Sequence, residues 1–210
     1  MGKLVLVRHG ESQWNEKGLW TGRTDIDLTE KGKEQARKAG EAIKHLSFSI
    51  AFTAPLSRTR HTLDEIKAIL ADKTFPDFID EALVERDYGE LTGKNKWDVK
   101  KEYGEEQFNA WRRGWDNPPP KGESLKDVYN RVVPFYETKI LPRLIEGENV
   151  LLVTSGNELR GLIKYLENIS DKDIENVEIK TGEVWEYDVN KEGEAGKKHV
   201  ILENTDPGNQ

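Results

Sequence analysis

Three residues that could do chemistry, Arg8, His9 and Gly10, directly follow a short apolar run, Leu4–Val7, which predicts a buried strand. A histidine fixed at a strand end can act as a nucleophile or a general base, and Gly10 lets the backbone approach a ligand closely. Arg8 could bind a phosphate group through two parallel hydrogen bonds. The alternative is structural: His9 would make a hydrogen bond at the strand end, and Arg8 would form an ion pair with an acidic residue. These residues alone leave both interpretations open.

A second candidate is the turn Thr154-Ser155-Gly156-Asn157, between an expected strand at Val150–Val153 and an expected helix that begins at Gly156. The unpaired N–H groups and the dipole of a helix N-terminus favour a bound anion. The turn itself contains no His, Cys, Asp or Lys. Ser155 lacks the Gly-x-Ser-x-Gly elbow of a hydrolase nucleophile, so the reacting group must lie elsewhere.

The elements that must position these residues alternate along the chain, which favours a three-layer α/β/α sandwich with a mainly parallel central sheet. Apolar runs predict strands at 4–7, 50–53, 150–153, 184–189 and 199–202. Helices are expected from Thr29, from Pro55, over 96–115, from Ser124 and from Gly156, with Pro134 and Pro142 bending or ending the fourth. Residues 80–93 are expected to be irregular.

Ligands bind at the carboxyl ends of the strands in open sheets of this kind. Three strand ends therefore matter: Arg8-His9-Gly10, Thr53–Arg58 and Thr154–Asn157. If the sheet is parallel there, these three turns share one rim.

Composition limits the alternatives. The chain has 210 residues, of which 35% are hydrophobic, so a single domain over 1–210 is expected, with a frayed polar tail at 203–210. The net charge of −7 argues against nucleic-acid or membrane-surface binding, and it requires any anion site to be a local cluster of positive charge.

No cysteine is present, which excludes disulfides and thiolate metal sites, and no His/carboxylate cluster predicts a metal. The N-terminal apolar run is too short for a signal peptide to be expected, and no apolar segment is long enough to cross a membrane. A cytoplasmic protein is the expectation.

Longer stretches carry a resemblance to a known family. LVRHGESQWN, LVERDYGELTGKNK, YGEEQFNAWRRGWDNPPP, GESLKDVYNRVVPFYETKILPRL and LRGLIKYLENISDKDI resemble the histidine phosphatase superfamily, and within it the cofactor-dependent phosphoglycerate mutase branch. The similarity runs from about Lys3 to about Val189. The Arg-His-Gly triplet is moderately specific, whereas Glu85–Gly89 together with Trp111-Arg112-Arg113 is far more so.

The resemblance implies an enzyme that interconverts 2- and 3-phosphoglycerate, in glycolysis and gluconeogenesis, with 2,3-bisphosphoglycerate as primer. His9 would accept the phosphoryl group, and Arg8 and Arg58 would neutralise the charge on its oxygens. Glu85 would be the general acid and base, although a simple ion pair with Arg86 is the alternative. The partners implied are small phosphorylated three-carbon acids, and a homodimer is expected by family analogy only.

The resemblance also implies a set of phosphate- and substrate-binding residues. Those near the transferred phosphate are Gly10, Glu11, Ser12, Gln13, Trp14, Asn15, Thr21, Gly22, Gly156 and Asn157. Those expected around the substrate carboxylate and second phosphate are Arg86, Asp87, Tyr88, Lys96, Arg112 and Arg113. His61, one helical turn after Arg58, either approaches this site or is exposed.

Two departures from the family pattern bear on activity. Ser155 stands where the family has its second active-site histidine, and Asp87 stands where the mutases commonly have a histidine. Ser155 can donate one hydrogen bond but cannot be cationic, so we expect it to be a weaker catalytic donor. A short segment at Pro120–Gly122 and a short tail predict a more open site. The sequence therefore leaves three interpretations: a mutase, a phosphatase acting on small phosphate esters, and an inactive binder of phosphorylated metabolites.

Overall fold

The computed structural model describes residues 1–206 and contains a six-stranded sheet in the order β3-β2-β4-β1-β5-β6. The strands are β1 (Gly2–Arg8), β2 (Ile50–Thr53), β3 (Asp77–Ile79), β4 (Val150–Thr154), β5 (Val184–Val189) and β6 (His199–Leu202). The first four strands in this order are parallel to one another. β5 pairs antiparallel with β1, and β6 pairs antiparallel with β5. The predicted mainly parallel sheet is confirmed.

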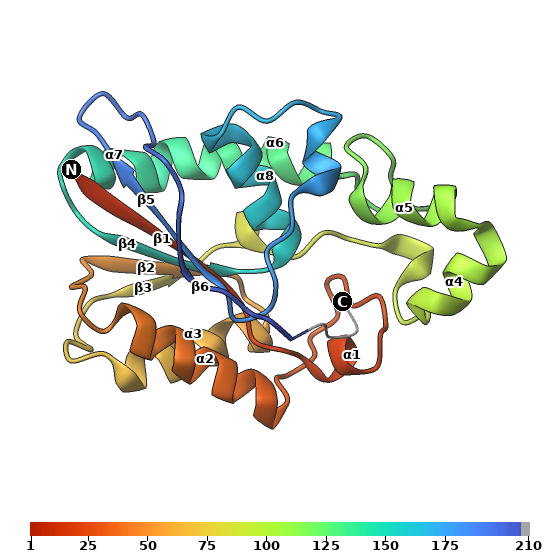
Figure 1. Cartoon of the computed structure of the whole chain (residues 1–210), viewed down its shortest axis with the longest axis horizontal. Helices are drawn as coiled ribbons and strands as arrows, with labels where there is room; N and C mark the ends of the chain where they lie inside the picture. Colours follow the sequence, from red (N-terminus) through yellow and green to blue (C-terminus); the bar gives the residue numbers. More distant parts are fainter. Residues whose placement is uncertain (207–210) are drawn as a thin grey trace.

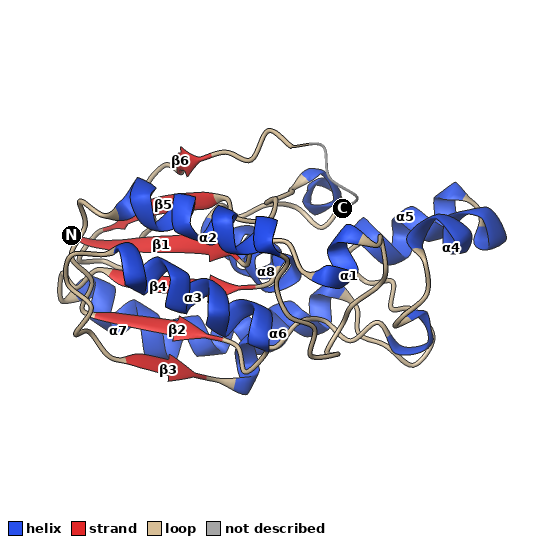
Figure 2. Ribbon diagram, turned by 90° about the horizontal axis from the view of Figure 1, so that it is seen from below, coloured by secondary structure: helices blue, strands red, loops and turns tan. Residues whose placement is uncertain are grey.

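Helices cover both faces of this sheet (Figures 1 and 2). They are α1 (Gln13–Glu16), α2 (Glu30–Ile43), α3 (Ser57–Ile69), α4 (Lys96–Tyr103), α5 (Glu105–Arg113), α6 (Leu125–Phe135), α7 (Leu141–Ile145) and α8 (Gly156–Leu166). α2 and α3 lie on one face, while α6, α7 and α8 lie on the other, which gives the expected three layers. α4 and α5 project beyond the carboxyl ends of the parallel strands.

The apolar run of β1 is buried from both sides. Leu4 and Leu6 join the core under α6 and α8, whereas Val5 and Val7 join the core under α2 and α3. Successive side chains of a strand point to opposite faces, so a strand covered on both faces is continuously apolar. This arrangement brings the carboxyl ends of β1, β2 and β4 to one edge, as the sequence predicted.

Some elements differ from the prediction. A single helix over 96–115 is wrong, because the chain breaks at Gly104 (φ +85°) into α4 and α5. β3 was not predicted, because it is only three residues long and its side chains are exposed. The helix after Ser124 ends at Phe135, one residue past Pro134, and a π-helical turn (136–140) connects it to α7, which contains Pro142 near its start.

The loop after β1 packs directly on the start of α2. A Cβ atom at Gly10 would lie 2.1 Å from the Gly32 carbonyl oxygen, and one at Gly32 would lie 2.1 Å from the Glu11 carbonyl oxygen. Real Cβ atoms do not approach so closely, so both positions require glycine. The backbone beside His9 is thereby fixed against α2.

Part of the tail that the sequence predicted to fray is held to the body. Asn204 accepts a hydrogen bond from Lys180 Nζ through its carbonyl oxygen, and its own backbone N–H donates to Glu183 Oε1. Residues 207–210 lie outside the described part of the chain.

Candidate active site

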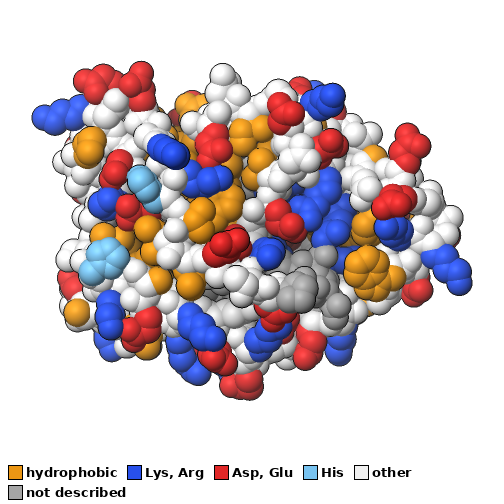
Figure 3. All heavy atoms as spheres, viewed as in Figure 1, with side chains coloured by type: hydrophobic (Ala, Val, Ile, Leu, Met, Phe, Trp, Pro, Cys, Tyr) orange, Lys and Arg blue, Asp and Glu red, His pale blue; other side chains and the backbone are white. Residues whose placement is uncertain are grey.

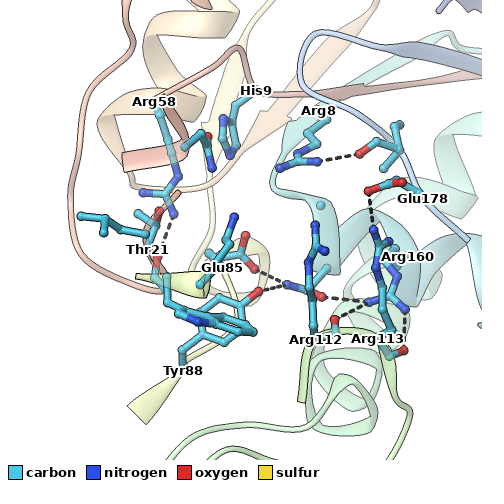
Figure 4. Close-up of a pocket in the computed structure, with 18 residues that line it drawn as sticks. Arg8, His9, Thr21, Arg58, Glu85, Tyr88, Arg112, Arg113, Arg160 and Glu178 are labelled. Carbon is cyan, nitrogen blue, oxygen red and sulfur yellow. Dashed lines mark hydrogen bonds and ion pairs between the residues drawn. The ribbon is translucent and has the colours of Figure 1, made fainter. Parts of the chain in front are cut away.

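The three strand ends form one wall of a pocket, which the 85–88 loop, α4 and the end of α5 complete. Basic side chains gather in a recess between the sheet and the α4–α5 pair (Figure 3). The described residues that line the pocket are Arg8, His9, Asn15, Leu19, Trp20, Thr21, Gly22, Arg58, Glu85, Tyr88, Lys96, Arg112, Arg113, Gly156, Asn157, Arg160, Glu178 and Ile179 (Figure 4).

His9 is almost completely buried, with 2% of its surface exposed. Its Nδ1 lies 2.6 Å from the Gly10 carbonyl oxygen, which can only accept, so Nδ1 carries the proton and Nε2 keeps a lone pair. Burial, and then the charges of Arg58 and Arg8, hold the pKa of His9 well below its usual value. The imidazole is therefore neutral at neutral pH, which is the state a nucleophile needs.

Two guanidinium groups flank this histidine, that of buried Arg58 and that of half-buried Arg8 (Figure 4). Arg58 Nη1 and Nη2 donate to the carbonyl oxygens of Thr24 (2.9 Å) and Gly22 (2.8 Å), which fixes the group to the loop before α2. Arg8 Nη1 donates to the Ile179 carbonyl oxygen at 2.8 Å. Burial lowers the pKa of both arginines, although Glu85 acts in the opposite direction. Such desolvated cations interact strongly with an anion.

Glu85, one of two carboxylates in the pocket lining, acts on the charges of both Arg8 and Arg58 (Figure 4). Its Oε1 accepts hydrogen bonds from the Arg86 backbone N–H (2.8 Å) and from Asn157 Nδ2 (2.9 Å). Asn157 Nδ2 also lies 2.9 Å from the Tyr88 hydroxyl. The alternative of an ion pair between the Glu85 and Arg86 side chains is not what holds this carboxylate, because the contact is to the Arg86 backbone.

The far end of the pocket contains Lys96, Arg112 and Arg113. Burial, and then the charge of Arg112, lower the pKa of Lys96 to about 7. Burial, and then the charge of Arg113, lower the pKa of Arg112 to about 10. Arg113 Nη2 forms an ion pair with Glu178 Oε1 at 2.5 Å. This end can therefore accept a second anionic group, with one carboxylate already present.

Arg160, which the sequence analysis missed, positions the arginine pair. Its Nη2 donates to the carbonyl oxygens of Arg113 (2.7 Å) and Ile174 (2.9 Å), and its Nη1 lies 3.2 Å from Asn157 Oδ1. One guanidinium therefore ties α5, α8 and the segment before β5 together. The sequence signal that could have identified Arg160 is its position one helical turn after Asn157, on the same face of the helix.

Other lining residues were also missed. Glu178 and Ile179 precede β5, and because β5 is antiparallel to β1, its start lies beside the carboxyl end of β1. Leu19 and Trp20 follow α1 and form part of the apolar wall. His61 does not line the pocket, because its Nδ1 is paired with Asp27 Oδ1 at 2.7 Å and its side chain is 43% exposed.

Several residues that were expected to bind or catalyse do not line the pocket: Gly10, Glu11, Ser12, Gln13, Trp14, Arg86, Asp87 and Ser155. Some of them instead hold lining residues in place. Ser12 caps α1 and donates to Asn15 Oδ1, whereas Glu11 accepts from Thr29 and Lys31. Arg86 is fully buried and donates to the Trp111 carbonyl oxygen. Asp87 accepts from the Gly89 backbone N–H, which shapes its turn.

Ser155 is fully buried, and its Oγ has no hydrogen-bond partner among the described residues. It occupies the N-cap position of α8 without a side-chain capping bond. Glu158, one turn on, pairs with Arg131 (3.1 Å), and burial and then Glu85 raise the pKa of its carboxyl well above the usual value. The serine hydroxyl is thus beside the pocket wall, while its neighbours Gly156 and Asn157 line it.

Comparisons with known proteins decide the family. The profile of the histidine phosphatase superfamily (branch 1) matches residues 4–201. The chain belongs to the histidine phosphatase superfamily. Two similar relatives are named 2,3-bisphosphoglycerate-dependent phosphoglycerate mutase. The protein of Parvibaculum lavamentivorans is 45% identical to this chain, and the match covers 95% of this chain and 96% of the relative. That of Bradyrhizobium diazoefficiens is 47% identical, covering 93% and 95%.

Members of the superfamily with solved structures share the fold. The alpha-ribazole phosphatase of Shigella flexneri superposes with a TM-score of 0.79 at 26% identity, covering 97% of this chain and 99% of its own. Within residues 1–206, no group of three or more His, Asp or Glu side chains is arranged to hold a metal ion. The described helices include none that is both long and apolar enough to cross a membrane.

We expect anion binding to weaken as the pH rises through 7, because a bound anion favours the charged form of Lys96 and the empty pocket lets it lose its proton. Sulfate keeps a constant charge, so its dissociation constant should rise between pH 6 and 8.5, by up to about tenfold per unit above the pKa. Calorimetric titration measures this directly.

Lys96→Met should weaken sulfate binding and flatten its pH dependence. Lys101→Met, an exposed position of the same helix, is the matched control and should behave like the wild type. A pH profile that is equally steep in Lys96→Met would contradict the assignment to Lys96.

Proposed function

We propose that this chain is a phosphoglycerate mutase, which interconverts 2- and 3-phosphoglycerate through a phosphohistidine at His9, with 2,3-bisphosphoglycerate as primer. The observation that carries the proposal is one pocket with two cationic ends and a carboxylate between them. Arg8, Arg58 and neutral His9 suit a phosphoryl group, whereas Lys96 and Arg112 suit the rest of an acidic substrate. The names of the relatives support the same activity.

In the proposed reaction, His9 Nε2 attacks a phosphorus atom of 2,3-bisphosphoglycerate. A P–N bond forms, the P–O bond to the substrate breaks, and Glu85 gives its proton to the leaving oxygen. In the return step a substrate hydroxyl loses its proton to Glu85 and attacks the phosphorus of phosphohistidine, so a P–O bond forms, the P–N bond breaks and Nε2 recovers its lone pair. Arg8 and Arg58 neutralise the oxygens of the phosphoryl group throughout, and the Gly10 carbonyl keeps Nδ1 protonated.

A phosphatase acting on small phosphate esters is the second candidate. It is favoured by the structural similarity to an alpha-ribazole phosphatase and by the buried position of the Ser155 hydroxyl, which leaves the transferred group with fewer donors. In that case water replaces the substrate hydroxyl in the second step, and the first step is unchanged. An inactive binder is the third candidate.

One assay distinguishes these candidates. The protein is mixed with 3-phosphoglycerate, with and without 2,3-bisphosphoglycerate, and both 2-phosphoglycerate and free phosphate are followed. We expect isomerisation that depends on the primer and exceeds phosphate release. Phosphate without isomerisation would support the phosphatase, and neither product would support the binder.

Ser155→His should raise the rate of isomerisation, because a longer side chain that can carry a charge reaches from the N-cap of α8 toward the transferred group. The loss of one transition-state hydrogen-bond donor lowers the rate on the order of 10²–10³-fold, so the rate should rise by no more than this factor in the variant. The turnover number is measured together with the unfolding temperature. Ser47→His, at an exposed position, is the control. An unchanged or lower rate in a stably folded variant would mean that the site is built around serine.

A further inference from the structure

Glu178 is an acid in a pocket whose other charged residues, apart from Glu85, are cations. It lies in the segment between a 3₁₀ turn (Asp173–Asn176) and β5, next to Ile179, whose carbonyl oxygen accepts from Arg8. Figure 4 shows its side chain pointing toward Arg113, at the end of the pocket away from Arg58. With 38% of its side chain exposed, it borders the opening.

The carboxylate is a fixed negative charge. Partial burial raises the pKa of Glu178. The hydrogen bond and the charge of Arg113 outweigh this effect, so the net shift of the pKa is downward. Its charge also reaches Arg8, Arg112 and Arg160, since it raises the pKa of each of them against the effect of burial. One carboxylate therefore partly neutralises several arginines of the pocket, and it acts most directly on Arg113, with which it is paired.

A ligand that binds this end meets a cation already paired with an anion. Its anionic group must share Arg113 with Glu178 or displace it, and the repulsion grows with the charge of that group. A monophosphorylated three-carbon acid brings one carboxylate here, if its phosphate lies at His9. A bisphosphorylated acid brings the carboxylate and a second phosphate. Repulsion from Glu178 therefore weakens the binding of the more highly charged ligand more strongly.

We propose that Glu178 is a specificity-determining residue, which weakens the binding of bisphosphorylated three-carbon acids relative to monophosphorylated ones. This inference rests on the function proposed above and adds a selectivity to the same site. In the reaction, a weaker hold on the bisphosphorylated intermediate lets it leave more often before the return step. More primer is then needed to keep His9 phosphorylated.

Equilibrium binding tests the inference. Dissociation constants for 3-phosphoglycerate and 2,3-bisphosphoglycerate are measured by calorimetry in a His9→Asn background, which prevents transfer, with and without Glu178→Gln. Removing the charge should tighten the bisphosphorylated ligand by roughly threefold to tenfold and the monophosphorylated ligand by less. The change in selectivity should shrink in high salt, since a charge at the pocket opening is screened.

Glu175→Gln is the matched control, because Glu175 is exposed, lies three residues earlier and does not line the pocket. It should leave both constants unchanged. Equal tightening of both ligands, or weaker binding of both, would overturn the inference, and the second result would mean that Glu178 merely holds Arg113 in place.

The failure of this inference differs from that of the proposed function. If both ligands bind and the wild type isomerises, but Glu178→Gln leaves selectivity unchanged, only the role of Glu178 is wrong. If neither ligand binds and the wild type shows no isomerisation, the proposed function and the inference both fall.

Discussion

Enclosing several positive charges in one pocket is the electrostatic constraint on which this site depends. Arg58, Lys96 and Arg160 are buried and Arg8 is half-buried, in a protein whose net charge is −7. Desolvation disfavours each charge, and it lowers the pKa of all four groups. Backbone carbonyl oxygens at Gly22, Thr24, Ile179 and Arg113 compensate in part. In the proposed function, the anionic substrate supplies the remaining negative charge.

The sheet meets this constraint by geometry. Parallel pairing of β1 with β4 and of β4 with β2 puts three strand ends in one row, and each end contributes a different element of the pocket. Antiparallel β5 adds the loop before it, which carries Glu178 and Ile179. The close approach of Gly10 and Gly32 fixes the backbone beside His9, so the position of this histidine does not depend on a mobile loop.

Much of this could be predicted from the sequence. The apolar runs at β1, β2 and β4 gave correct strands, and the parallel arrangement followed from their alternation with helices. The break at Gly104 could not be predicted, because the polar residues around it suit one helix as well as two. β3 was missed because it depends on pairing with β2 and not on an apolar pattern of its own.

Of the residues expected in the site, those at or soon after the carboxyl end of a parallel strand lie in the pocket lining, as do His9, Arg58 and Asn157. Prediction was poorer where a motif mixes lining residues with supporting ones. Within the 85–88 loop, Glu85 and Tyr88 line the pocket while Arg86 and Asp87 do not, because neighbouring residues of an irregular loop point in different directions. Arg160 and Glu178 were missed because their roles arise from tertiary contacts with α5.

We infer that a neutral, buried His9 carries the phosphoryl group. The most direct test is mass spectrometry of the intact protein and its peptides after brief exposure to 2,3-bisphosphoglycerate. We expect an acid-labile phosphoryl group on His9, which disappears when 3-phosphoglycerate is added. Isomerisation of phosphoglycerate without phosphate on His9, or with phosphate on another residue, would rule out the proposed role of His9.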